Sequence, residues 1–379
     1  MKFIIKKDIL LENLIHTSKA ISSKNLIPIL TGIKFELTEE GLYLYASDTD
    51  ISIKSFIPID EITEVKELGS VVVLGKYIVE AIRKMSYTDI AIEVLDGYKM
   101  LITADSSDNN VVRNNSFKLN GINPNEYPNL DMEVTKEPII FKNNLFKTII
   151  NQTFFATSQN ESRPLLTGIN FKLKDNMLEV IATDSYRLSK KNIKLDVNIE
   201  NDVNIVIPGR NLLEFSKILT EDDDNLEMHI FPNKVLFKYK NIMFLSRLLS
   251  GTYPATSEII PTNFDIVVNC KYCDLYSLID SSSLCTSDRE KNTISLELSK
   301  NELKISSNSP EIGYSEGKIN VECDSNLSIS FSSKYMIEAI RSFSQDEITL
   351  CFNGDSSPIV VKSSKDESLI QLVLPIKTY

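Results

Sequence analysis

The chain has 379 residues, enough for two or three domains that each bury a core of their own. Its 42% hydrophobic and 25% charged residues are ordinary for a soluble globular protein, and no apolar run is long enough to cross a bilayer. The net charge of −11, taken alone, argues against nucleic-acid binding. Five cysteines without framework spacing favour free thiols, and with them a cytoplasmic location.

The first part of the chain predicts strands and two amphipathic helices. Apolar residues with a period of two predict strands, and apolar residues at i, i+3 and i+4 predict helices. The expected elements are a strand at 1–5, a helix at 8–21, strands at 29–37, 42–46, 51–57 and 71–74 with a polar loop before the last, a helix at 76–85, and strands at 90–94, 99–104 and 116–119. A stretch rich in Pro and Asn at 123–128 and an acidic stretch at 131–137 indicate a link.

After this link the same order of elements returns. The second part predicts a strand at 138–141, a helix at 143–158, strands at 169–173, 178–182 and 203–207, a helix at 210–219, and strands at 226–230, 234–239 and 243–249. A second link follows at 250–261. The third part predicts helices at 271–285 and 334–343, a strand pair within 293–309, and a closing strand at 369–374.

Direct repeats in the sequence explain this order. The segment TGIKFELTEEGLYLYASD at 31–48 matches TGINFKLKDNMLEVIATD at 167–184 without a gap. A third, more diverged copy lies at 293–309. The octet KYIVEAIR at 76–83 returns as KYMIEAIR at 334–341, with a middle counterpart at 210–217. A repeat of this length is typical of whole domains. We therefore predict an α+β protein of three tandem similar domains, at 1–130, 137–261 and 262–379.

The charges are distributed unevenly between the expected helices and the rest of the chain. Together the six helices carry a small positive charge, so the remaining residues are more acidic than the whole chain. Helices that share one surface would make it mildly basic. The alternative is that lysines simply decorate solvated helix faces.

Motifs that support catalysis or metal binding are missing from the sequence. His16 and His229 are each isolated, and no Gly-rich phosphate loop is present. Cys270 and Cys273 form a lone CxxC motif, which leaves a thiol enzyme as an alternative function. We expect neither a metal nor a cofactor, and we expect that the protein is not an enzyme.

Several motifs together resemble the bacterial DNA polymerase III beta subunit family, the sliding clamps. The resemblance rests on the triplication, LIPIL at 26–30, ATDSYRL at 182–188, SGTYP at 250–254 and VLPIKTY at 373–379. It implies a head-to-tail homodimer that closes a ring of six domains, with helices lining the hole and antiparallel sheets outside. Such a ring encircles duplex DNA without reading its sequence and is a processivity factor. The implied partners are the DNA polymerase catalytic subunit, the clamp loader and repair proteins with clamp-binding peptides, and no membrane.

The resemblance also carries three sets of residues onto this chain. The partner-peptide cleft would be formed by Leu166, Thr183, Ser185, Tyr186, Arg187, Leu188, Pro254, Ile259, Tyr335, Val373, Leu374, Pro375, Ile376 and Lys377. The DNA-binding residues would be Lys24, Arg83, Lys84, Lys147, Arg210, Lys217 and Arg341. The dimer contact would use Tyr77, Ala81, Met85, Phe117 and Leu119, against a loosely matched region at 286–291.

Two departures from the family pattern stand at the cleft. Glu258 replaces an arginine of the best-known members, and the tail runs one residue further, to Tyr379. From the residues alone, Leu166, Leu188 and Val373 are better explained as core residues, and Tyr335 as an ordinary helix residue. Besides the ring clamp, a scaffold protein that binds no DNA stays open as an alternative.

Overall fold

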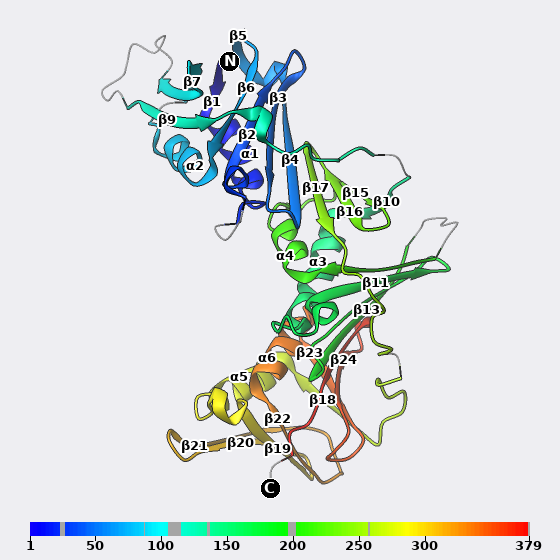
Figure 1. Ribbon diagram of the computed structural model, residues 1–379. Helices are drawn as coiled ribbons and strands as arrows, with labels where there is room; N and C mark the ends of the chain where they lie inside the picture. The colour runs from blue at the N-terminus through cyan, green and yellow to red at the C-terminus, as the bar shows by residue number, and fades with distance from the viewer. Residues whose placement is uncertain are drawn as a thin grey trace. The chain divides into compact units, whose positions relative to one another are not determined.

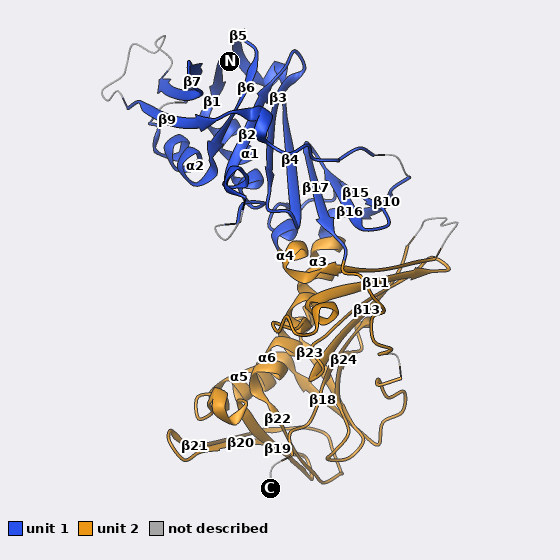
Figure 2. Cartoon of the chain, in the orientation of Figure 1, with its two compact units in different colours: residues 1–144, 214–248 blue, residues 145–213, 249–379 orange. Residues whose placement is uncertain are grey.

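The computed structural model describes residues 1–22, 27–86, 88–104, 115–134, 137–195, 202–256 and 258–377. The chain forms two compact units (Figure 2). Unit 1 contains residues 1–144 and 214–248, and unit 2 contains residues 145–213 and 249–379. None of the helices in the described part of the chain is long and apolar enough to span a membrane.

Unit 1 is built on one antiparallel sheet of thirteen strands (Figure 1), in the order β10-β15-β16-β17-β4-β3-β2-β6-β9-β8-β7-β1-β5. The strands are β1 (Lys2–Lys6), β2 (Gly32–Leu37), β3 (Gly41–Ser47), β4 (Ile51–Pro58), β5 (Ile62–Glu67), β6 (Gly69–Leu74), β7 (Asp89–Leu95), β8 (Lys99–Ala104), β9 (Phe117–Ile122), β10 (Ile139–Lys142), β15 (Asn225–Ile230), β16 (Lys234–Tyr239) and β17 (Ile242–Arg247). Short 3₁₀ turns lie at Pro28–Thr31, Ile59–Glu61 and Pro124–Glu126.

Two helices cover this sheet, α1 (Lys7–Ser18) and α2 (Gly75–Lys84). They pack against each other, α1 over β3 and β4 and α2 over β6 and β2. Leu10 and Leu14 of α1 and Ile78 and Ile82 of α2 are fully buried. This i, i+4 spacing places the apolar residues of each helix on one face, and burial of that face on the sheet stabilises the helix.

Unit 2 contains an eight-stranded sheet, in the order β14-β11-β12-β13-β25-β24-β23-β18, and a four-stranded sheet, β21-β20-β19-β22. The strands are β11 (Gly168–Lys174), β12 (Met177–Thr183), β13 (Arg187–Lys194), β14 (Val203–Pro208), β18 (Ile266–Lys271), β19 (Thr293–Ser299), β20 (Glu302–Ser309), β21 (Gly313–Asn320), β22 (Leu327–Ser332), β23 (Glu347–Phe352), β24 (Ile359–Ser363) and β25 (Asp366–Val373). Short 3₁₀ turns lie at Phe154–Ala156, Pro164–Thr167 and Asp288–Glu290.

Helices α5 (Tyr272–Ser283) and α6 (Ser333–Arg341) pack against each other over the sheets of unit 2. Leu275 and Ile279 of α5 and Met336 and Ile340 of α6 join one core with strands of both sheets. Helices α3 (Asn143–Thr153) and α4 (Gly209–Ser216) each contain residues of both units. Each sheet therefore has helices on it, as expected for an α+β protein with amphipathic helices.

The predicted elements differ from the structure mainly at their ends. Helix α1 ends at Ser18 rather than at residue 21, because the N–H groups of residues 19–21 bond to carbonyls three residues back and the chain continues as 3₁₀-type turns. The expected helix at 143–158 ends at Thr153 and continues as a 3₁₀ turn. Strand β5 falls in the predicted polar loop. No predicted strand corresponds to β13, because its lysines hide the alternation.

Candidate functional site

The loop between β12 and β13 has a fixed backbone. Ser185 lies in the left-handed region with φ of 77°. The Asp184 carboxylate accepts the backbone N–H groups of Tyr186 at 2.9 Å and of Arg187 at 3.0 Å. The Thr183 hydroxyl donates to the Arg187 carbonyl at 2.6 Å and so closes the loop. This bonding directs the Tyr186 side chain outward, where it is 60% exposed.

Arg187 is held inside the protein. Its side chain is only 9% exposed, its Nε donates to Asp184 at 3.0 Å, and it also pairs with Glu338 on α6. The guanidinium lies 4.4 Å from the centre of the Tyr335 ring. These contacts hold the Tyr335 ring in place on the face that packs on the Arg187 guanidinium. Burial, followed by the nearby Asp184 charge, raises the pKa of Tyr335, so its phenol stays neutral at physiological pH.

The C-terminal tail follows β25 and crosses two elements. The Leu374 N–H donates to the Tyr186 carbonyl at 2.9 Å, and the Ile376 N–H donates to the Ser330 carbonyl of β22 at 2.7 Å. The rings of Tyr186 and Tyr335 lie 6.5 Å apart and are nearly parallel. The tail and the two rings therefore form two walls that backbone hydrogen bonds hold in place.

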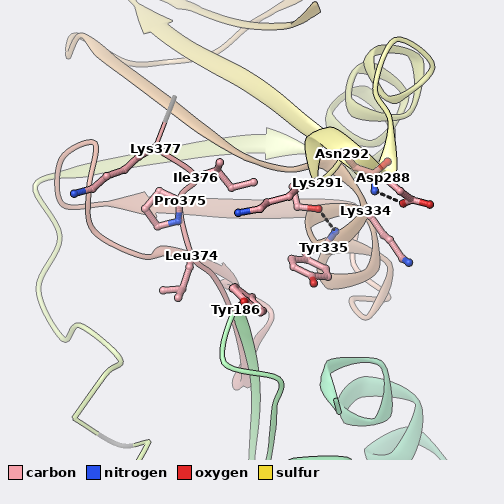
Figure 3. A pocket seen from close by; sticks show the side chains of 11 residues that line it. Tyr186, Asp288, Lys291, Asn292, Lys334, Tyr335, Leu374, Pro375, Ile376 and Lys377 are labelled. Atoms are coloured by element: carbon pink, nitrogen blue, oxygen red, sulfur yellow. Dashed lines mark hydrogen bonds between the residues drawn. The ribbon is translucent and has the colours of Figure 1, made fainter. Parts of the chain in front are cut away.

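A cavity of about 610 Å³ lies between these walls (Figure 3). Its lining comprises Tyr186, Asp288, Lys291, Asn292, Ser332, Lys334, Tyr335, Leu374, Pro375, Ile376 and Lys377. Two aromatic rings and three tail residues make one part apolar, whereas polar groups from 288–292 and from the start of α6 line the rest. An apolar groove with a few polar groups is typical of sites that receive short peptides or small ligands.

The structure brings only part of the predicted cleft into this cavity. Tyr186, Tyr335, Leu374, Pro375, Ile376 and Lys377 line it. Leu166 and Leu188 are buried in an adjoining apolar cluster with Leu374 packed against it, and Val373 lies in the core of the C-terminal part. The buried Thr183 N–H donates to the Tyr253 hydroxyl at 3.1 Å, and the exposed Ser185 accepts from Arg163. Pro254 and Ile259 are exposed outside the lining.

The sequence reasoning missed five lining residues, Asp288, Lys291, Asn292, Ser332 and Lys334. A signal for them exists in the repeat. The segment before the third-copy strand, EKNT at 290–293, occupies the position of PILT at 28–31 and PLLT at 164–167. Since Leu166 was assigned to the cleft, its counterpart Asn292 and the neighbouring Lys291 were candidates by position.

The predicted DNA-binding residues that the structure describes lie on helices or, in one case, directly after a helix. Arg83 and Lys84 are exposed on α2, Arg210 on α4 and Arg341 on α6, and Lys147 lies on α3. Lys217 follows α4 directly and is exposed. Lys24 lies outside the described residues. Arg83 pairs with Glu80 and Lys217 with Glu214, so these two charges are partly compensated. Arg341 donates to the neutral hydroxyl of Tyr276 and keeps its full charge.

The predicted dimer residues differ in accessibility. Tyr77 is exposed on α2, and Phe117 and Leu119 are half-buried on β9. Ala81 and Met85 are buried within the chain, with Met85 only 1% exposed. The Met85 carbonyl also accepts from Lys7 Nζ at 2.6 Å. Only Tyr77, Phe117 and Leu119 thus offer side chains to another molecule.

The cysteine and histidine residues do not form a reactive centre. Burial raises the pKa of the Cys270 thiol to about 12, so it is no nucleophilic thiolate at neutral pH. Cys273 is exposed and lies beside Asp274. His229 is buried next to Glu227 at 3.2 Å. Among the described residues, no three His, Cys, Asp or Glu side chains gather as a metal site would require.

Comparison with known proteins identifies first the class and then the family. Solved DNA polymerase sliding clamps share the fold: that of Bacillus subtilis is 38% identical with a TM-score of 0.94, and the beta chain of Streptococcus pneumoniae is 31% identical with a TM-score of 0.92. Both alignments cover 100% of each chain. Models of the DNA polymerase III beta subunit match residues 1–131 as N-terminal, 141–255 as central and 257–377 as C-terminal domain. The chain belongs to the DNA polymerase III beta subunit family.

Full-length relatives agree with this assignment. The beta sliding clamp of Bacillus subtilis strain 168 is 39% identical over 389 residues, and that of Staphylococcus epidermidis is 38% identical over 385 residues. In both cases all of this chain and all of the relative are covered. The predicted family and the predicted α+β fold of three similar domains are confirmed. The function of a DNA polymerase processivity factor is supported, and the scaffold and thiol-enzyme alternatives are not.

Proposed function

We propose that two copies of the chain close head to tail into a ring around duplex DNA and tether the replicative polymerase to it. The observation that carries this proposal is the strand pairing between successive domains. Strand β4 of the first domain pairs with β17 of the second, and β13 of the second pairs with β25 of the third. Each pairing makes one continuous antiparallel sheet across a domain boundary.

The corresponding strands at the two ends of the chain lack this pairing. In the repeat, β21 takes the place of β4 and β13, and β9 takes the place of β17 and β25. Within the described chain, β21 pairs only with β20, and residues 117–120 of β9 pair only with β8. A chain with one such edge at each end can join a second copy by the same antiparallel pairing. Two copies joined in this way form a closed ring.

Exposed side chains near both edges support the proposed contact. The exposed Tyr77 and the half-buried Phe117 and Leu119 lie near one edge, and Tyr314 on β21 is exposed near the other. Leu284, directly after α5, is 77% exposed. Large exposed apolar side chains beside an unpaired strand edge are expected at an interface.

The proposed DNA contacts are weak and not specific for sequence. Arg83, Lys84, Arg210 and Arg341 are exposed on helices and would meet phosphates, which carry no sequence information. The charge of one of them, Arg83, is partly compensated by an ion pair with Glu80. Weak, mobile phosphate contacts suit a ring that slides, and the acidic remainder of the chain disfavours DNA elsewhere.

The cavity beside Tyr186 is the proposed docking site for partner peptides. The polymerase catalytic subunit is the principal partner, and the clamp loader and repair proteins would use the same cleft. We further propose that the chain has no catalytic activity and no bound cofactor, and that it is located in the cytoplasm. Its proposed domains are residues 1–130, 137–261 and 262–379. The proposal keeps Lys24 as a DNA contact. It also keeps the buried residues Leu166, Leu188 and Val373, as support for the walls of the cleft.

Encirclement is tested by topology. The protein, loaded onto nicked circular DNA by a clamp loader, should be retained after gel filtration and released once the circle is cut. Retention that survives linearisation would contradict a ring. The mass in solution should be twice 42.9 kDa. Leu119→Asp, which puts a charge on the free edge of β9, should halve this mass and abolish retention while leaving the far-ultraviolet circular dichroism unchanged.

A further inference from the structure

One wall of the cavity is cationic. Three lysines, Lys291, Lys334 and Lys377, line it together with a single acid, Asp288. All three lysines are exposed, and in the described part of the chain none of them forms an ion pair. The Asp288 carboxylate already accepts a hydrogen bond from the Asn292 side chain at 2.8 Å. The apolar walls therefore adjoin an excess of positive charge.

Lys291 stands on a rigid turn. It follows the 3₁₀ turn at 288–290 with φ of 56°, and Asn292 has φ of 51°, so both lie in the left-handed region. The Asn292 N–H donates to the Ser287 carbonyl at 2.9 Å, and the Asn292 carbonyl accepts the Ser333 N–H at 2.8 Å. The turn is thus bonded on both sides, which lowers the ordering cost when a ligand binds.

The three lysines differ in direction. In Figure 3 the Lys291 side chain extends across the cavity toward the tail at Pro375, whereas Lys334 and Lys377 point outward on opposite sides. An anion seated among the apolar groups would therefore meet the Lys291 ammonium first.

We infer that Lys291 makes this cleft selective for peptides that carry a carboxylate side chain among their apolar anchors. The inference rests on the proposed function, because it concerns the same cleft. Leucine or phenylalanine side chains of the peptide would pack on Leu374, Ile376 and the tyrosine rings, and a glutamate or aspartate between them would pair with Lys291. A nucleic-acid phosphate is disfavoured, because its flanking sugars would leave the apolar tail uncovered.

The test uses three blocked peptides that share the same leucine and phenylalanine anchors. They differ at one intervening position, which is glutamate, glutamine or lysine. Fluorescence anisotropy gives their affinities for the wild-type protein, for Lys291→Glu and for Arg289→Glu. Arg289 is the matched control, since it adjoins this turn, is exposed outside the cavity lining and changes charge by the same amount.

In the wild type the glutamate peptide should bind roughly threefold to tenfold more tightly than the glutamine peptide, with the preference decreasing as salt rises. Lys291→Glu should reverse the order, so that the lysine peptide binds best, and Arg289→Glu should preserve the wild-type order. Equal affinities of all three peptides for the wild type, or no reversal in Lys291→Glu, would overturn the inference and leave the cleft intact as a peptide site. If no peptide binds at all, the proposed cleft itself fails.

Discussion

At the first junction between domains β4 pairs with β17, and at the second β13 pairs with β25. The loops that enter the junctions, 47–51 and 183–187, have the same backbone. Thr49 and Ser185 have φ of 81° and 77°. In each loop one aspartate accepts two successive backbone N–H groups, at 2.9 and 3.0 Å. The hydrogen bond that follows each junction is also the same. The Arg247 N–H donates to the Asp50 carbonyl at the first junction, and the Leu374 N–H donates to the Tyr186 carbonyl at the second.

The side chains on these equal backbones differ in kind. Asp50 occupies the position of Tyr186, and Ile51 the position of Arg187. The tail residues Leu374, Pro375 and Ile376 have Arg247, Leu248 and Leu249 as counterparts, and Asn211 stands where Tyr335 stands. The fold thus repeats the junction, and a few residue differences distinguish the second junction, where we propose a peptide cleft. The following four experiments test this distinction.

Removal of the tail should have the largest effect. Deleting residues 374–379 removes the Leu374 and Ile376 side chains and two backbone hydrogen bonds at the second junction. Affinity for the glutamate peptide should fall roughly a hundredfold or more, because two aliphatic contacts are lost. Titration calorimetry measures the affinity, and the dimer mass should stay unchanged. Undiminished binding would place the cleft elsewhere.

Arg187→Ala should destabilise the second junction. The change leaves Asp184 and Glu338 without their cation and removes the support beneath the Tyr335 ring. The free energy of unfolding in urea should fall by about 2 kcal/mol, and peptide affinity should fall as well. Arg247→Ala, the same chemical change at an exposed residue of the first junction, should alter stability by less than about 0.5 kcal/mol. Similar effects of both variants would remove the distinction.

The second junction should also be the more sensitive to acid. Lys191 on β13 pairs with Asp366 on β25 at 2.9 Å, whereas the corresponding Ser55 of β4 makes a neutral bond to Asn13. Although burial opposes its ionisation, hydrogen bonds from Ser368 and Lys191 lower the pKa of Asp366. The pair therefore stabilises the fold above the ordinary carboxyl pKa of about 3.9, and this contribution is lost as the pH falls through the lowered folded value.

Removal of the Asp366 carboxylate should make the difference in acid sensitivity between the two junctions measurable. Asp366→Asn should lower the free energy of unfolding at pH 7 by roughly 1–2 kcal/mol and by progressively less toward pH 3. Hydrogen exchange of β13 and β4 at both pH values assigns the change to a junction. A loss of protection in β4 equal to that in β13 would contradict the assignment.

The smallest effect should come from transferring one cleft residue to the first junction. Asp50→Tyr introduces the ring of Tyr186 on an equal backbone but without the tail or a counterpart of Tyr335. Asp50 is exposed, so stability should change by less than about 0.5 kcal/mol. Titration should still give one peptide per chain. A second binding event would mean that a single tyrosine suffices to make a cleft.

Sequence patterns predicted most strands and the three domains, because half-buried strands alternate visibly and the repeats align without gaps. They failed at β5, whose pattern is almost wholly exposed, and at β13, whose Lys190 and Lys191 pair with Glu179 and Asp366. In the third part they also missed β18 and β21 to β24. Charged residues that are half-buried through ion pairs carry no apolar signal, so alternation alone cannot find such strands.

The cleft was predictable only in part. Tyr186, Tyr335 and the tail followed from the family resemblance. The proposed contribution of Lys291 did not, because only its position in the repeat marks it and the third copy has lost its apolar residues there. The inward role of Arg187 depends on Glu338, which is 151 residues away in the chain. Contacts of this kind are set by tertiary structure, and local sequence does not encode them.

The pairing of β4 with β17 has a consequence during synthesis. Ile53 of β4 pairs with Phe244 of β17, so the outer edge of the first domain has no partner until most of the second domain has left the ribosome. At 5–20 residues per second, this interval is roughly ten to forty seconds. Hairpins form in microseconds, so the nascent first domain carries an open strand edge for almost all of that time. Neighbouring nascent chains on the same messenger RNA are then the most immediate competitors for that edge.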